Sequence, residues 1–162
     1  MFSNSTMPET REEVCLLMDE LLIRSLELVE QEVKLKTTIE AITNEGRLNL
    51  AQTRYHKGPN SVSSVQLPTE DYKEFNALNT VTESKDDEGI TKLKLEQHPV
   101  DKDNGYIDPI RWFGVLIPPT LQDARKKFTR SVEFVVECAN VQIELRSILL
   151  KFEELNKMKN NM

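Results

Sequence analysis

Few side chains in this sequence are suited to catalysis or to metal binding. The histidines are His56 and His98, each in turn-like sequence near Gly or Pro, and the cysteines are Cys15 and Cys138. Catalytic and metal sites need several such groups close together, yet no CxxC, HExxH, GxSxG or phosphate-loop pattern occurs. We interpret the histidines as exposed loop residues and the cysteines as small apolar residues on helix faces. We therefore expect no catalytic residue, no cofactor and no metal.

Charged groups are abundant but do not converge on a site. The chain has 162 residues and a net charge of −6, so a general affinity for nucleic acid or acidic membrane is not expected. The basic cluster of Arg125, Lys126, Lys127 and Arg130 could contact phosphates or an acidic partner, but its helical setting favours a solvated face. The carboxylates follow helical charge patterns, and no apolar pocket is indicated that would raise a pKa.

Residues 10–57 are predicted to form one long helix. Thr10 is a good N-cap, and Gly58 with the following proline ends the segment. Apolar residues recur in alternating steps of four and three, which is the seam of a coiled coil. Gly46 lies where this register changes, which favours a kink there. The predicted seam consists of Val14, Met18, Leu21, Ser25, Leu28, Glu32, Leu35, Ile39 and Ile42.

Residues 120–158 are predicted to form a second helix. Pro119 holds the chain extended before it, and Thr120 suits the N-cap. The same stepping gives a second seam of Leu121, Ala124, Phe128, Ser131, Val135, Cys138, Gln142, Leu145, Leu149 and Phe152. Two amphipathic helices of similar length on one chain most simply pair as an antiparallel hairpin.

Residues 58–107 are predicted to be an acidic variable linker. Its residues 59–107 carry 10 acidic and 5 basic residues and show no sustained hydrophobic period, which is typical of disorder. Residues 90–96 alternate apolar and polar side chains and fit a short strand, but no partner strand is evident. The expected fold is therefore all-α: a long antiparallel two-helix coiled-coil hairpin with a long, mostly disordered acidic connector.

Residues 108–119 hold the only Trp and the longest apolar run, "WFGVLI". A two-helix hairpin is too thin to bury its own surface, and apolar flanks are expected to stay exposed at Leu22, Val29, Val132, Val136 and Ile143. The apolar run either closes the helical hairpin as an internal plug or docks on a partner, and both roles are compatible. The predicted partner interface is Trp112, Phe113, Gly114, Leu116, Pro118 and Leu121, with the two aromatic residues as anchors.

Two motifs resemble the coiled-coil assembly factors of the vacuolar H⁺-ATPase. The first motif, "DPIRWFGVLIPPTLQDA", matches that family at Asp108, Pro109, Trp112, Phe113, Gly114, Val115, Leu116, Ile117, Pro118, Thr120 and Leu121. The second, "LNLAQTRYHKGPNSV", matches at Leu48, Leu50, Ala51, Arg54, Tyr55, Ser61 and Val62. The order of helix, polar linker, apolar motif and final helix is also similar, although the linker itself does not match.

The resemblance implies a non-catalytic chaperone for the membrane sector of the proton pump. It implies a place at the cytosolic face of the endoplasmic reticulum, or at other early secretory or endosomal membranes, through a membrane-spanning assembly factor. The expected partners are that factor and membrane-sector subunits of the pump, with no nucleic acid. The start of the chain lacks a signal-peptide pattern, and no stretch is apolar enough to span a membrane. The alternative is a generic coiled-coil scaffold or tether in vesicle traffic.

Overall fold

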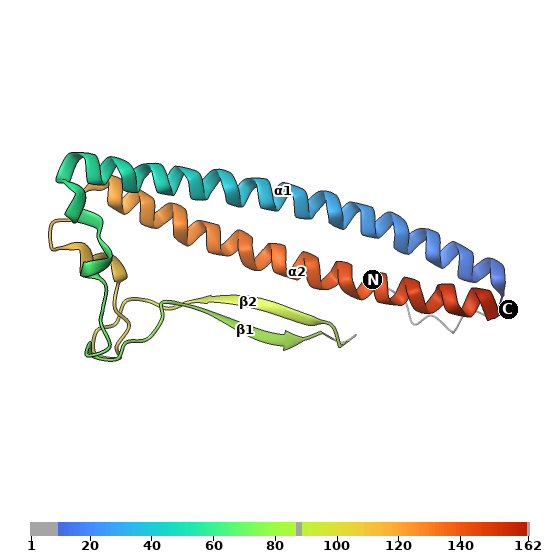
Figure 1. Cartoon of the computed structure of the whole chain (residues 1–162). Helices are drawn as coiled ribbons and strands as arrows, with labels where there is room; N and C mark the ends of the chain where they lie inside the picture. The colour runs from blue at the N-terminus through green and yellow to red at the C-terminus, as the bar shows by residue number, and fades with distance from the viewer. Residues whose placement is uncertain (1–9, 87–88, 162) are drawn as a thin grey trace.

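The computed structural model describes residues 10–86 and 89–161, and two long helices dominate it (Figure 1). Helix α1 spans Arg11–Lys57 and helix α2 spans Pro119–Asn161. Thr10 begins α1 with a complete capping box, because its side chain accepts from the Glu13 backbone N–H while the Glu13 carboxylate accepts from the Thr10 N–H. Gly58, at φ 95°, ends α1 in a conformation that favours glycine.

The two helices pack side by side in opposite directions, as predicted. Arg24, near the start of α1, pairs with Glu144, in the second half of α2, at 2.7 Å. At the other end of the pair, the hydroxyls of Thr53 and Thr120 form a hydrogen bond of 2.7 Å. Thr53 is only 1% exposed, so this bond satisfies two polar groups where the helical hairpin closes.

The core lies along the seam between the helices, and the predicted seam of α1 is confirmed in its N-terminal half. The predicted seam of α2 is right from Leu121 to Ser131, and after that it is right at every second position and wrong between them. Val135, Gln142 and Leu149 are exposed, whereas Phe134, Val141, Ile148 and Leu155 pack in the core. Core positions along a helix are separated by three and four residues in turn, and the series can start with either step. The order seen in the structure buries an apolar residue, whereas the predicted order would bury Gln142.

Gly46 does not interrupt α1, which is continuous through it. The glycine is buried, and a Cβ atom built on it would lie 3.0 Å from the ring of Phe128 on α2. The register changes here because an aromatic ring of one helix lies directly over the backbone of the other.

The described part of the connector is folded, so the structure is mostly helical rather than all-α, and the predicted disorder of the linker is not observed. The connector begins with the 3₁₀ turns Pro59–Val62 and Ser64–Gln66. Strands β1, Asn79–Lys85, and β2, Thr91–Gln97, then pair antiparallel, with Val81 opposite Leu95. The strand expected near residue 90 therefore has a partner. It was missed because β1 is polar and largely exposed, and so lacks an apolar period.

A side chain of α2 holds the β-hairpin in place. Asn140 accepts a hydrogen bond from the Leu93 backbone N–H at 2.8 Å and donates one to the Leu93 carbonyl at 2.9 Å. Its amide therefore pairs with the outer edge of β2 as a neighbouring strand would. The β-hairpin lies along α2 (Figure 1), and Val136, on the same side of α2 as Asn140, is buried rather than exposed as predicted.

Candidate partner-binding surface

The apolar motif begins as an internal plug at the closed end of the helical hairpin. The 3₁₀ turn η3, Pro109–Phe113, starts where the Asp108 carboxylate accepts from the Ile110 N–H at 3.2 Å. The same carboxylate pairs with Arg125 of α2 at 3.1 Å, which fixes η3 against the helix. The plug is a small second core made of Val62, Ile110 and Leu121, with Leu50, Phe113 and Ile117 packed against it.

Trp112 packs against aromatic residues of the connector. Its ring meets Phe75 edge-on at 5.2 Å between centroids and Tyr72 at 6.4 Å. The indole Nε1 is buried, and no acceptor among the described residues lies within hydrogen-bond distance. A buried donor without an acceptor costs stability, so packing of the three rings must hold Trp112 there.

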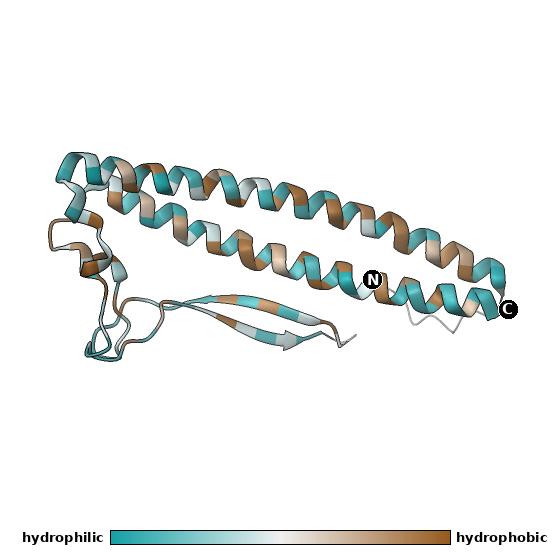
Figure 2. Ribbon diagram, in the orientation of Figure 1, coloured by the Kyte–Doolittle hydropathy of each residue, from teal (hydrophilic) through white to brown (hydrophobic). Residues whose placement is uncertain are grey.

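The motif then turns outward in a segment that we call the tip loop, residues 114–118. Gly114 has φ 125°, which favours glycine at this turn. Val115 is 86% exposed and Leu116 is 92% exposed. Val65 and Tyr55, from the segments that meet this end of the molecule, are 88% and 87% exposed. Exposed apolar side chains therefore gather at the closed end of the helical hairpin, where Figure 2 shows apolar colour in the loops.

The six residues of the predicted interface fall into different environments. Leu121 is buried, Phe113 is half-buried against the plug, and Trp112 is half-buried in the aromatic cluster. Gly114 and Leu116 are exposed, and Pro118 is half-buried. The prediction left out Val115, although it stands in the same apolar run. It also left out Tyr72 and Phe75, which could have been noticed as the aromatic pair of an otherwise polar linker.

The residues considered for chemistry have structural surroundings. His98 stacks on Tyr106 at 5.0 Å and its Nε2 lies 2.9 Å from the Thr80 hydroxyl. His56 lies in α1 rather than in a loop. Cys138 is buried in the main core, as its helix-face position predicted.

The basic cluster on α2 is engaged within the chain. Arg125 pairs with Asp108, and Lys126 pairs with Asp123. Lys127 pairs with Glu45 of α1. The guanidinium of Arg130 lies 5.8 Å from the centre of the Phe134 ring. Within the described ranges, no group of three or more His, Cys, Asp or Glu side chains is arranged to hold a metal ion. In the same ranges, neither long helix has an apolar stretch that could cross a bilayer.

Known proteins resemble this chain over most of its length, although no family model matches it. It is 23% identical to Vacuolar ATPase assembly protein VMA22 of Homo sapiens over 146 residues, which cover 77% of this chain and 81% of that protein. It is 24% identical to the protein of the same name from Mus musculus, with 80% and 87% covered, and 24% identical to that from Danio rerio, with 77% and 81% covered. These similarities agree with the resemblance that the two motifs indicate: over most of its length the chain is similar to proteins named for vacuolar ATPase assembly.

Proposed function

We propose that this protein is a non-catalytic assembly factor for the membrane sector of the vacuolar proton-pumping ATPase. It acts at the cytosolic face of the endoplasmic reticulum, together with a membrane-spanning assembly factor. The observation that supports this most strongly is the similarity to proteins named for vacuolar ATPase assembly over about four fifths of the chain. An exposed apolar surface on a protein of this shape is also what a binding role requires.

The tip loop is the surface that we propose for the partner. Val115 and Leu116 are adjacent, apolar and almost fully exposed, and the plug beneath them fixes the loop at both ends. Burying one such aliphatic side chain is worth about 2 kcal/mol, so the pair could supply a substantial part of the binding free energy. Trp112 and Phe113 support the loop from below, which gives them an indirect role in this interface.

A substitution at the tip loop tests the proposal. Leu116→Asp leaves the folded chain intact, since the side chain contacts mainly solvent, but it removes an apolar contact and adds a charge to the interface. Loss of about 2 kcal/mol corresponds to a roughly 30-fold weaker complex. The tagged chain is purified from detergent-solubilised membranes, and its partners are identified by mass spectrometry.

The same purification includes a control variant and distinguishes the assembly role from the alternatives. Leu150→Asp changes an aliphatic residue that is 57% exposed on α2, far from the tip loop along the helix. The unchanged chain and Leu150→Asp should recover pump membrane-sector subunits and a small membrane-spanning protein, and Leu116→Asp should lose them. Recovery of vesicle-tethering proteins in place of pump subunits would favour a scaffold in vesicle traffic. Equal recovery with both variants would move the interface away from the tip loop.

A further inference from the structure

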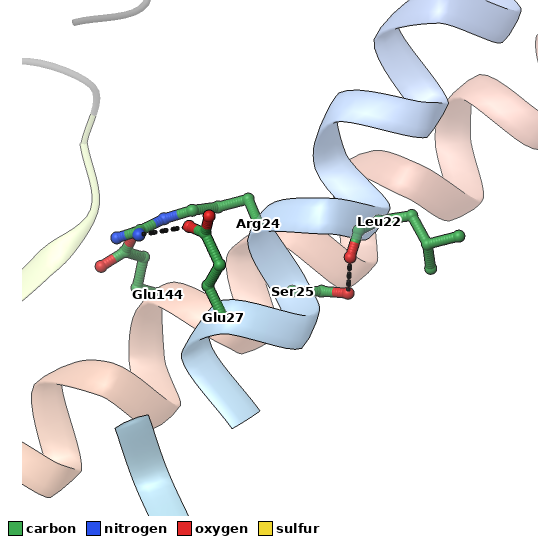
Figure 3. A network of polar contacts seen from close by, with 5 residues as sticks. All are labelled: Leu22, Arg24, Ser25, Glu27 and Glu144. Atoms are coloured by element: carbon green, nitrogen blue, oxygen red, sulfur yellow. Dashed lines mark hydrogen bonds and ion pairs between the residues drawn. The ribbon is translucent and has the colours of Figure 1, made fainter. Parts of the chain in front are cut away.

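Among the described residues, the β-hairpin covers one side of the helical hairpin, and no element covers the opposite side. The β-hairpin borders the side that carries the Arg24–Glu144 ion pair, since Glu144 and Asn140 share a hollow with Ile90 and Lys92. In Figure 3 the side chains of Arg24 and Leu22 leave α1 in opposite directions.

Helix geometry places a stripe of α1 on the bare side. Each residue advances a helix by about 100°, so residues two, five or nine positions from Arg24 lie about 140–180° away from it. Those positions hold Leu22, Leu26, Val29 and Val33, which are 49%, 62%, 43% and 59% exposed. Four aliphatic residues within about three turns are therefore left uncovered by residues 10–86 and 89–161.

Helix α2 extends this stripe. Val135 and Leu149 are displaced by about 180° and 140° from Glu144, and each is 48% exposed. We call the six residues on the two helices the open face. At roughly 100 Å² for a half-exposed aliphatic residue, the six side chains expose on the order of 600 Å² of apolar surface. The polar Gln142, bonded to Glu32, lies between Val135 and Leu149 on the same face. A stable interface buries about 800 Å² per partner, so the open face fits its apolar centre.

The two margins of the open face carry opposite charges. Asp19 lies on the α1 margin and Arg146 on the α2 margin; both are exposed, and neither forms an ion pair of 4.0 Å or less among the described residues. In the register that sets Arg24 beside Glu144, Arg146 lies level with Leu22, about one helical turn from Asp19. Glu153 shares the α2 margin and lies level with the uncharged Cys15.

We propose that the open face binds a second copy of this chain. A two-fold axis parallel to the helices places α1 of each copy across α2 of the other and closes a four-helix bundle. This axis leaves every residue at the same height along the bundle in both copies. Asp19 of each copy therefore comes within reach of Arg146 of the other, and the ion pair forms twice. An axis perpendicular to the helices, through the middle of the open face, would instead place Arg146 near Val135.

The molar mass of the purified full chain in solution tests the dimer. Light scattering after gel filtration should give twice the chain mass of 18.7 kDa. Leu26→Lys should give the single-chain mass with unchanged helical circular dichroism. Leu48→Lys is the matched control, since Leu48 is 59% exposed and lies outside the open face; this variant should stay dimeric. A single-chain mass for the unchanged protein up to about 100 µM, as expected if a different protein covers the face, would overturn the proposal.

A charge exchange tests the arrangement of the two copies. Arg146→Glu sets two acids opposite one another twice per dimer and should raise the dissociation constant about tenfold, the size expected for two exposed ion pairs. Adding Asp19→Arg to the same chain restores opposite charges and should return the constant to its starting value. A double variant that dimerises no better than Arg146→Glu alone would overturn the parallel axis. These measurements need no pump subunit. The dimer proposal can therefore be refuted while the assembly role stands, and the assembly role can be refuted while the dimer stands.

Discussion

Replacing Asn140 by alanine should release the β-hairpin from α2. The Asn140 amide makes both hydrogen bonds to the backbone of Leu93, at 2.8 and 2.9 Å. A further hydrogen bond joins the β-hairpin to α2 between the exposed side chains of Gln97 and Glu133. An isolated two-stranded hairpin is marginally stable in water, so attachment to α2 should decide whether this one stays folded.

The expected loss of stability follows from the two hydrogen bonds that the substitution removes. Each contributes about 1 kcal/mol net, and both partner groups on Leu93 remain half-buried after the substitution. The expected loss is about 2 kcal/mol of local stability, or a roughly 30-fold larger open population. The main core between α1 and α2 does not include Asn140, so global helix unfolding should change much less.

Amide hydrogen exchange measures this local opening residue by residue. The backbone N–H groups of Lys92 and Lys94, which face β1 in the register that pairs Thr82 with Lys94, should exchange about 30-fold faster in Asn140→Ala. Amides in the middle of α1 should keep their rates. Asn156→Ala, at an exposed position of the same helix, serves as the control. Unchanged exchange in β1 and β2 would refute the view that Asn140 holds the β-hairpin.

Three smaller predictions concern the plug and the seam. Trp112→Phe keeps the aromatic packing and removes the buried donor without an acceptor, so its free energy of unfolding should stay within about 1 kcal/mol of the original, whereas Trp112→Ala should lose about 2–3 kcal/mol by denaturant titration. Gly46→Leu should destabilise by about 1–3 kcal/mol through collision with the Phe128 ring; adding Phe128→Ala should recover most of that loss, and a purely additive pair of costs would count against the contact. Hydrogen bonds from Gln142 and then Lys36 lower the pKa of Glu32, so the contribution of this carboxylate to stability is present above the ordinary glutamate pKa and is lost as pH falls through the lowered one. Gln142→Leu should therefore raise the pKa of Glu32 in an NMR titration, and an unchanged pKa would exclude the cross-helix bond.

The parts of the fold that follow an apolar period were predictable from sequence. The capping signal at Thr10, the glycine stop at Gly58 and the seam of α1 all reflect local rules that no distant contact overrides. The phase of the α2 seam was not predictable from spacing alone, because Val135 and Leu149 offer a second apolar row beside the buried one. Only packing against α1 decides which row is covered.

The β-hairpin of the connector was missed because its first strand and its hydrogen bonds to α2 are polar. Asn140 on α2 and the exposed β1 strand give no hydrophobic signal, although together they fix the β-hairpin. The interface residues were misjudged for a related reason. A continuous run such as "WFGVLI" shows that burial is needed somewhere, but only the turn at Gly114 separates the plug residue Phe113 from the exposed Leu116.

The measurement that tests the central claim most directly is the assembly of the pump membrane sector in cells that lack this protein. Membranes are solubilised in mild detergent, the assembled membrane sector is quantified by native electrophoresis, and the level of the introduced chain is checked in parallel. Restoring the unchanged chain or Leu150→Asp should restore the assembled sector, and Leu116→Asp at the same level should not. Normal amounts of assembled sector without the chain would contradict the proposed function.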